Sequence, residues 1–255
     1  MNVIYASDLD RTLIYSKRFI NEHPSNSTYS PVEYKGVEII SYMSDKVKDK
    51  LNNVANNNNV EFVPVTSRSI EEYNRVNLGI KPEYAIVSNG GTILHKGEPM
   101  DEWEEYFRNS MDKMNWLDAI NTVQMEFTTF EKTRIVDNKY IFGRTLRHEE
   151  FDAEANEFGK MLPGWQITRQ GNKVYIIPDN ISKQIALRWL WHRLGNPYIV
   201  ASGDGLLDLG MLSLANKAII PSHAVILDNH VEKATIAEGG IDSPLFTMDV
   251  IGALV

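Results

Sequence analysis

The residues best suited to chemistry stand at positions 8 to 12, where an apolar run ends in carboxylates and a hydroxyl. Val3 to Ser7 has the composition of a buried strand, and Asp8, Asp10 and Thr12 follow it. Such a run suits a strand buried on both faces of a parallel sheet, and open α/β sheets place their chemistry at the carboxyl ends of these strands. One carboxylate there could attack an electrophile while its neighbour transfers a proton. The alternative is a plain aspartate-rich turn, because aspartate commonly closes loops.

A second polar segment follows the apolar run 60–65. Thr66 and Ser67 close this run, and the capping-box spacing of Ser69 and Glu72 predicts a helix directly beyond them. Hydroxyl groups, free backbone N–H groups and a helix N-terminus together favour an anion. Taken alone, the two hydroxyls fit an ordinary turn equally well.

Two further segments supply the remaining charged side chains that could take part in chemistry. Lys183 lies in the first turn of a predicted helix that Ser182 caps, and Asp204 and Asp208 follow the apolar run 198–202. Lys183 alone would be a solvated helix residue, and both aspartates alone would suit a helix start. The sequence predicts that all these side chains gather with Asp8 at one sheet edge, since carboxyl ends of parallel strands meet there.

The combined residue types favour phosphoryl chemistry with a hard cation. Several carboxylates without thiols or a histidine cluster suit an oxygen-seeking ion, and Mg²⁺ is the natural choice. Lys183 with the hydroxyls of Thr66 and Ser67 suits the oxygens of a phosphoryl group. The set fits a reaction in which Asp8 accepts the phosphoryl group and water later releases it.

Bulk properties limit the class of protein. The 255 residues suffice for two domains, and 43% hydrophobic with 24% charged residues is ordinary for a globular chain. A net charge of -8 argues against a broad nucleic-acid surface. The absence of cysteine excludes disulfides and thiolate sites. No apolar run reaches the roughly 20 residues that span a bilayer, and no signal-type segment opens the sequence, so we expect no membrane partner and a cytoplasmic location.

The pattern of apolar residues and turn signals differs between about residues 96 and 178 from that on either side. Apolar residues recur at helical spacing from Trp103 to Met114 and from Phe151 to Leu162, and two probable hairpins turn at Asp137-Asn138 and Gly171-Asn172. These elements predict a small α+β cap inserted into a doubly wound, Rossmann-like α/β domain with a parallel sheet. The predicted domains are 1–95 plus 179–255 for the core and 96–178 for the cap. A further hairpin is predicted around Lys35-Gly36, and it would be either a flap beside the loop that follows position 8 or an ordinary surface loop.

The polar segments resemble, in order, the four motifs of the haloacid dehalogenase superfamily: Asp8 to Thr12, Thr66 to Arg68, Lys183, and Gly203 to Asp208. An insertion between the second and third motifs is similar to that of the large-cap branch, which includes sucrose-phosphate and mannosyl-phosphoglycerate phosphatases. More loosely, the runs around the first and last motifs look similar to members associated with tellurite-resistance clusters.

The resemblance implies a role for each residue. Asp8 is expected to be the nucleophile and a metal ligand. Asp10 is expected to be the general acid/base, with its backbone carbonyl on Mg²⁺. It also implies a phosphoric monoester hydrolase that acts on a small phosphorylated metabolite, such as a sugar phosphate, because an acid at position 10 suits ester rather than carbon–halogen cleavage.

The remaining motifs complete the implied site. Thr66 and Lys183 would hold the phosphoryl oxygens, Asp204 would bind the metal, and Asp208 would bind it directly or through water. Many relatives carry asparagine where this sequence has Leu207, which affects the expected metal shell but not the catalytic pair. Two other functions stay open: a phosphomutase with the same aspartyl-phosphate, and a receiver-like signalling module, against which the large insertion argues.

Overall fold

The computed structural model of the protein describes residues 1–111, 119–121, 123 and 128–255. The chain divides into two compact units, one formed by Met1–Met100 with Ser182–Val255 and the other by Asp101–Ile181. The second unit is thus an insertion in the first, with boundaries a few residues from those expected. The roles of core and cap for these two units stay predictions.

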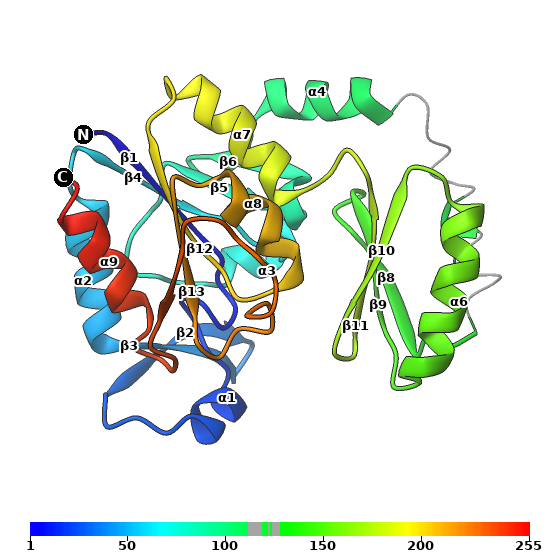
Figure 1. The fold of residues 1–255 in the computed structure, drawn as a ribbon, viewed down its shortest axis with the longest axis horizontal. Coiled ribbons are helices and arrows are strands. Elements are labelled where there is room, and N and C mark those ends of the chain that lie inside the picture. Colours follow the sequence, from blue (N-terminus) through cyan, green and yellow to red (C-terminus); the bar gives the residue numbers. More distant parts are fainter. Residues whose placement is uncertain (112–118, 122, 124–127) are drawn as a thin grey trace. The chain divides into compact units, whose positions relative to one another are not determined.

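The first unit is built on a parallel five-stranded sheet with β1 in an inner position (Figure 1). All four strand pairings are parallel, and β1 pairs with β12 on one side and β4 on the other. Along the sheet the strands are β14 (Ala234–Ala237), β13 (Lys217–Pro221), β12 (Tyr198–Ser202), β1 (Val3–Ser7) and β4 (Val60–Pro64). Every residue of β1 is buried, as expected for an inner strand covered on both faces.

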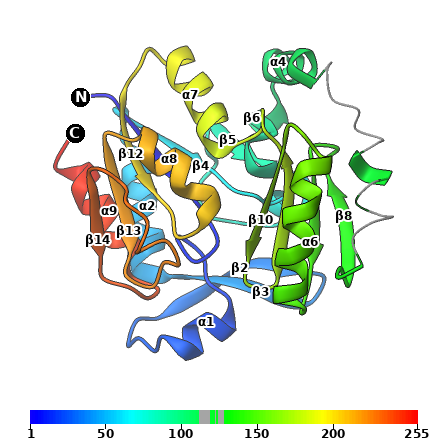
Figure 2. The same ribbon diagram turned by 45° about the vertical axis from the view of Figure 1, so that its right-hand side comes forward.

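Helices cover both faces of this sheet, which makes the unit doubly wound, as the sequence predicts. In Figures 1 and 2, α2 (Asp45–Ala55) and α9 (Pro244–Gly252) lie together on one face, and α7 (Lys183–Arg193) and α8 (Leu209–Leu214) on the other. Leu51 and Met248 from the first pair are fully buried in one cluster with Tyr5 of β1. This apolar layer packs against β1 and holds it in place below its carboxyl end.

Two small antiparallel sheets complete the first unit. The predicted hairpin at Gly36 is present and longer than expected, with β2 (Tyr29–Lys35) and β3 (Glu38–Ser44). The other sheet contains β5 (Tyr84–Val87), β6 (Thr92–His95) and β7 (Glu98–Pro99), and an isolated parallel bridge joins it to the end of β4 at Val65 and Ile86. Short helices α1 (Lys17–Glu22) and α3 (Ile70–Asn74) follow β1 and β4, and the capping box of α3 is confirmed at Ser69 and Glu72.

The second unit has the predicted α+β composition. Its antiparallel sheet runs in the order β10 (Trp165–Gln170), β11 (Lys173–Pro178), β9 (Tyr140–Arg144) and β8 (Lys132–Val136), with helices α4 (Asp101–Met111) and α6 (His148–Met161). Phe151 and Phe158 of α6 pack in one cluster with Val174 of β11, as their helical spacing predicts. Met114, expected on the same helical face as Trp103, lies outside the described residues. No helix within the described part of the chain is long and apolar enough to cross a membrane.

Candidate active site

Asp8 stands at the point where the central strand ends. Its backbone N–H donates to the carbonyl of Ser202, 2.9 Å away, and thereby extends the β1–β12 pairing by one residue. The side chain is 9% exposed. The hydroxyl of Thr12 donates to its Oδ2 over 3.4 Å. The carboxylate is therefore buried at the carboxyl end of the sheet.

Lys183 reaches the same place from the first turn of α7. The hydroxyl of Ser182 accepts a hydrogen bond from the backbone of Ile185 and caps this helix. Gly90 packs so closely on Ser182 that a Cβ would lie 2.2 Å from the Ser182 carbonyl oxygen, so only glycine fits there. The buried amine Nζ donates to Oδ1 of Asp8 and to Oδ1 of Asp208, each 2.6 Å away.

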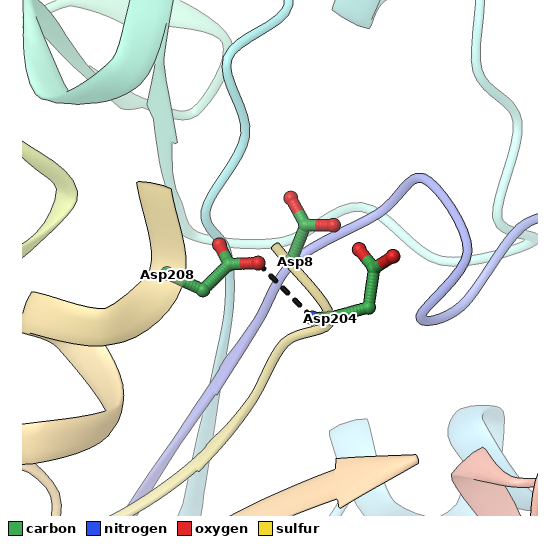
Figure 3. Close-up of side chains that lie close together, drawn as sticks. All are labelled: Asp8, Asp204 and Asp208. Atoms are coloured by element: carbon green, nitrogen blue, oxygen red, sulfur yellow. Dashed lines mark hydrogen bonds between the residues drawn. The ribbon is translucent and has the colours of Figure 1, made fainter. Parts of the chain in front are cut away.

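Asp204 and Asp208 approach from the loop that follows β12. Figure 3 shows their carboxylates beside that of Asp8, and one oxygen from each lies within 4.8 Å of the others. Oδ2 of Asp208 accepts from the backbone N–H groups of Asp204, at 3.0 Å, and Gly205, at 2.9 Å. Gly203 is required by this packing, because a Cβ would lie 2.7 Å from Cγ of Asp208. Asp208 therefore closes the loop and binds Lys183 at the same time.

The electrostatics of this cluster leave it short of positive charge. Burial, and then repulsion from Asp208, raises the pKa of Asp204 to about 7. Burial also raises the pKa of Asp8 well above its usual range, although attraction to Lys183 opposes this shift. Burial lowers the pKa of Lys183, but attraction to Asp208 and Asp8 outweighs it and leaves the pKa above its ordinary value. Three clustered carboxylates with one ammonium group favour binding of a further cation.

The donor set fits a hard divalent cation. Oδ2 of Asp204 is buried, and no described residue donates a hydrogen bond to it. Nε of Arg11 lies 3.5 Å from this oxygen and forms an ion pair without hydrogen-bond geometry. Carboxylate oxygens of Asp8, Asp204 and Asp208 are the ligand type that Mg²⁺ prefers. Leu207 adds no oxygen to the set, so this loop offers only its two carboxylates and backbone.

Asp10 does not join this cluster through its side chain. Its carboxylate is bound by the guanidinium of Arg68, with Nε 2.8 Å from Oδ2 and Nη2 2.9 Å from Oδ1. Thr66 is buried, and its hydroxyl accepts from the backbone of Arg68. Ser67 is half-buried beside it. Thus Asp8, Lys183, Asp204 and Asp208 converge, whereas Asp10 and Thr66 meet at Arg68.

Sequence reasoning gave no role to Arg68 or to Glu33, its second carboxylate partner. Arg68 stands within the quoted Thr66-Ser67-Arg68 motif, so its position was a usable signal. Glu33 lies in the predicted hairpin, yet nothing in its local sequence distinguishes it from a solvent-facing glutamate. The structure buries its side chain completely, 2.8 Å from Nη1 of Arg68.

Residues 1–239 match the family model of sucrose-6F-phosphate phosphohydrolase. The chain belongs to this family. The predicted membership of the haloacid dehalogenase superfamily is confirmed, and so, at the level of the family, is the predicted class of phosphoric monoester hydrolase. A search of curated protein sequences gives no match.

Solved structures that are similar to this protein over nearly its whole length support the fold. The sucrose-phosphatase of Synechocystis sp. PCC6803, in complex with sucrose and phosphate, has a TM-score of 0.69 at 13% identity, with 98% of each chain covered. A haloacid dehalogenase-like hydrolase from B. subtilis has a TM-score of 0.63 at 18% identity over 100% of both chains. The trehalose-6-phosphate phosphatase of Aspergillus fumigatus has a TM-score of 0.57 at 15% identity, covering 99% of this chain and 92% of its own. The predicted α/β class with an additional antiparallel domain is confirmed.

Proposed function

We propose that the protein is a Mg²⁺-dependent phosphatase that hydrolyses a small sugar phosphate through an aspartyl-phosphate on Asp8. The observation that carries this proposal is the buried amine of Lys183, which bridges Asp8 and Asp208 beside Asp204. A surface turn rich in aspartate would not bury its carboxylates around a lysine. A nucleophile next to fixed positive charge is the arrangement that phosphoryl transfer needs.

Asp8 and Asp10 divide the first step between them. A carboxylate oxygen of Asp8 attacks phosphorus and forms a new O–P bond, while the bond from phosphorus to the sugar oxygen breaks. The departing sugar oxygen takes a proton from the carboxyl group of Asp10. The products of this step are the free sugar alcohol and a phosphorylated Asp8.

The same pair completes the reaction in the second step. The carboxylate of Asp10 takes a proton from a water molecule, whose oxygen attacks phosphorus. The O–P bond to Asp8 then breaks, which regenerates the Asp8 carboxylate and releases inorganic phosphate. Asp10 is again protonated and ready for the next substrate.

The other residues of the site hold the phosphoryl group. We assign the hydroxyls of Thr66 and Ser67 and the amine of Lys183 to its oxygens. Asp8, Asp204 and the backbone carbonyl of Asp10 would hold Mg²⁺, with Asp208 bound directly or through water. When bound, Mg²⁺ supplies positive charge that offsets the repulsion between an anionic nucleophile and an anionic substrate.

The family match supports a phosphorylated disaccharide as substrate. We assign the unit formed by residues 1–100 and 182–255 as the catalytic core and residues 101–181 as the cap that selects the sugar. Sucrose 6-phosphate is the first candidate, because the matching family model carries its name. The phosphate of the proposed substrate is negatively charged. The net charge of -8 on the protein does not exclude such a substrate, because binding needs only a local positive site.

A phosphate-release screen tests this function. Sucrose 6-phosphate, trehalose 6-phosphate, hexose phosphates and unrelated phosphate esters are incubated with the protein in Mg²⁺ or in EDTA. Release of phosphate from a sugar phosphate in Mg²⁺, and its loss in EDTA, is the expected result. Movement of phosphate between positions of the sugar without release would instead identify a phosphomutase. A long-lived phosphoprotein without turnover would identify a receiver-like module, and either outcome would reject the proposal.

Cation binding is expected to depend on pH. In the metal-free protein the pKa of Asp204 is raised from 3.8 to about 7, so its burial costs stability progressively as pH rises from 3.8 through 7. A divalent ion needs the ionised form, so binding at pH 6 must displace a proton and is about tenfold weaker than at pH 8. This difference in affinity is measured by thermal unfolding at pH 6 and pH 8, each with the same fixed concentration of Mg²⁺ and with EDTA. The rise in Tm on adding Mg²⁺ should be larger at pH 8 than at pH 6, and Asp204→Asn should remove it at both.

A further inference from the structure

The β2–β3 hairpin contributes a fully buried carboxylate whose two arginine partners lie outside the hairpin, after β4 and α3. The side chain of Glu33 is 0% exposed. Its Oε1 lies 2.8 Å from Nη1 of Arg68 and 3.4 Å from Nη2 of Arg75, and its Oε2 accepts from the hydroxyl of Ser41 at 2.9 Å. A buried carboxylate is costly unless such partners compensate it, so this arrangement makes the hairpin depend on Arg68.

Arg68 is held between two carboxylates on different edges of its guanidinium. One edge, Nε and Nη2, makes a bidentate contact with Asp10, and Nη1 on the other side meets Glu33. The Arg68 side chain is 11% exposed, and Nη1 also lies 3.4 Å from the carbonyl of Glu72. Because the guanidinium is planar and rigid, fixing Nη1 at Glu33 also fixes the direction of the edge that faces Asp10.

Asp10 needs such external support. It lies in the loop beyond β1, and its side chain is 45% exposed, in contrast to the buried carboxylate of Asp8. A half-exposed aspartate has little packing to select one rotamer, so its contacts decide where its oxygens lie. The bidentate contact with Arg68 supplies that restraint, and general acid–base catalysis requires the proton donor to stand within hydrogen-bond reach of the reacting oxygen.

We propose that Glu33 is a positioning residue for the acid/base step, which acts on Asp10 through the guanidinium of Arg68. This role rests on the proposed phosphatase function, and it gives the β2–β3 hairpin a part in catalysis. Glu33 touches neither substrate nor phosphorus. It holds Arg68 in the orientation that fixes the direction of the Asp10 carboxylate. Both oxygens of Asp10 accept from Arg68, so the proton given to the leaving oxygen in the first step is one taken up on a free lone pair, from solvent before the first turnover and from the attacking water in the second step of each turnover.

The dependence on leaving group distinguishes this role from a structural one. A sugar oxygen is a poor leaving group and needs the proton from Asp10, whereas p-nitrophenolate departs without one. The value of kcat/KM reports steps up to the first irreversible one, which here is transfer to Asp8. Glu33→Gln is therefore expected to lower kcat/KM about 10- to 100-fold for the best sugar phosphate of the screen, since a positioned acid contributes about 10²–10⁴-fold. For p-nitrophenyl phosphate, kcat/KM should change less than about threefold, because that transfer needs no proton.

Glu71→Gln is the matched control. Glu71 also pairs with Arg75, at 3.2 Å, but its side chain is 89% exposed, and it has no ion pair with Arg68 among the described contacts. This variant should keep both activities. If Glu33→Gln fails to fold, Arg68→Lys gives the same test, because it keeps the positive charge but loses the bidentate fork, and it should give the same selective loss.

The possible results separate this inference from the proposed function. Equal losses for the sugar phosphate and p-nitrophenyl phosphate, or no loss for either, in a folded Glu33→Gln or Arg68→Lys protein would overturn the positioning role and leave the phosphatase intact. A parent protein that releases no phosphate from any ester would reject the function itself. A burst of about one equivalent of p-nitrophenolate followed by slow turnover in Glu33→Gln would further support the role, since the second step also uses Asp10.

Discussion

Replacing Asp8 by asparagine is expected to reduce phosphate release by at least about 10³-fold, because the covalent step begins at this carboxylate. The amide is close in size and can still accept a hydrogen bond from Lys183, so the fold should be retained. It lacks the negative charge needed to attack phosphorus. The measurement is kcat/KM for the best sugar phosphate in saturating Mg²⁺, together with thermal unfolding of parent and variant.

Asp49→Asn is the control for this substitution. Asp49 lies on the exposed side of α2 in the same unit, and the change removes the same single charge. It should keep full activity. Comparable rates for parent and Asp8→Asn would reject the aspartyl-phosphate mechanism, and a loss in both variants would point to net charge rather than to the nucleophile.

Replacing Lys183 by methionine is expected to affect both stability and activity. The change leaves Asp8 and Asp208 buried without their shared ammonium partner, 2.6 Å from each in the parent. Breaking a buried pair in this way costs about 3 kcal/mol, or about 6 to 12 °C in Tm for a chain of this size. Loss of a fixed cation at the phosphoryl group should lower kcat by about 10² or more. Thermal unfolding at pH 8 in EDTA and in Mg²⁺ gives the first effect, and phosphate release the second.

The response to Mg²⁺ identifies the cause of the instability. Mg²⁺ bound to the same carboxylates would replace part of the lost positive charge, so it should raise the Tm of Lys183→Met by more than it raises that of the parent. Lys139→Met is the control, because Lys139 is a second buried lysine, 2.6 Å from Glu104 in the other unit. It should be destabilised without any added response to Mg²⁺. An identical response in all three proteins would contradict the assignment of the cation to this cluster.

The sequence predicted the elements whose signals are local. The apolar run of β1 ends abruptly at Asp8, Ser182 stands one residue before Lys183 at a helix start, and Gly36 marks the tip of the hairpin. Each of these signals lies within a few neighbouring residues, so spacing alone was sufficient to place them. The convergence of Asp8, Lys183 and Asp208 followed from one general rule, that the carboxyl ends of parallel strands share an edge.

The parts that could not be predicted depend on distant partners or on weak patterns. Strands β6 and β14 have four residues each, too few for a periodic signal, and their sequences include Ala, Thr and His. The engagement of Asp10 by Arg68, 58 residues later, was not visible either, since a bidentate contact has no sequence signature. Glu33 is the clearest case, because an alternating hairpin pattern predicts polar residues outside, whereas two arginines compensate its burial.

The inner position of β1 has a consequence for how the protein acquires its shape during synthesis. Strand β1 pairs on one side with β4, which is synthesised soon after it, and on the other with β12, whose residues Tyr198–Ser202 are synthesised almost two hundred residues later. At translation speeds of about 5–20 residues per second, the nascent strand would wait about 10 to 40 s for that neighbour. Until then one edge of an apolar strand stays unpaired, and mispairing with other strands is the main hazard for this segment during synthesis.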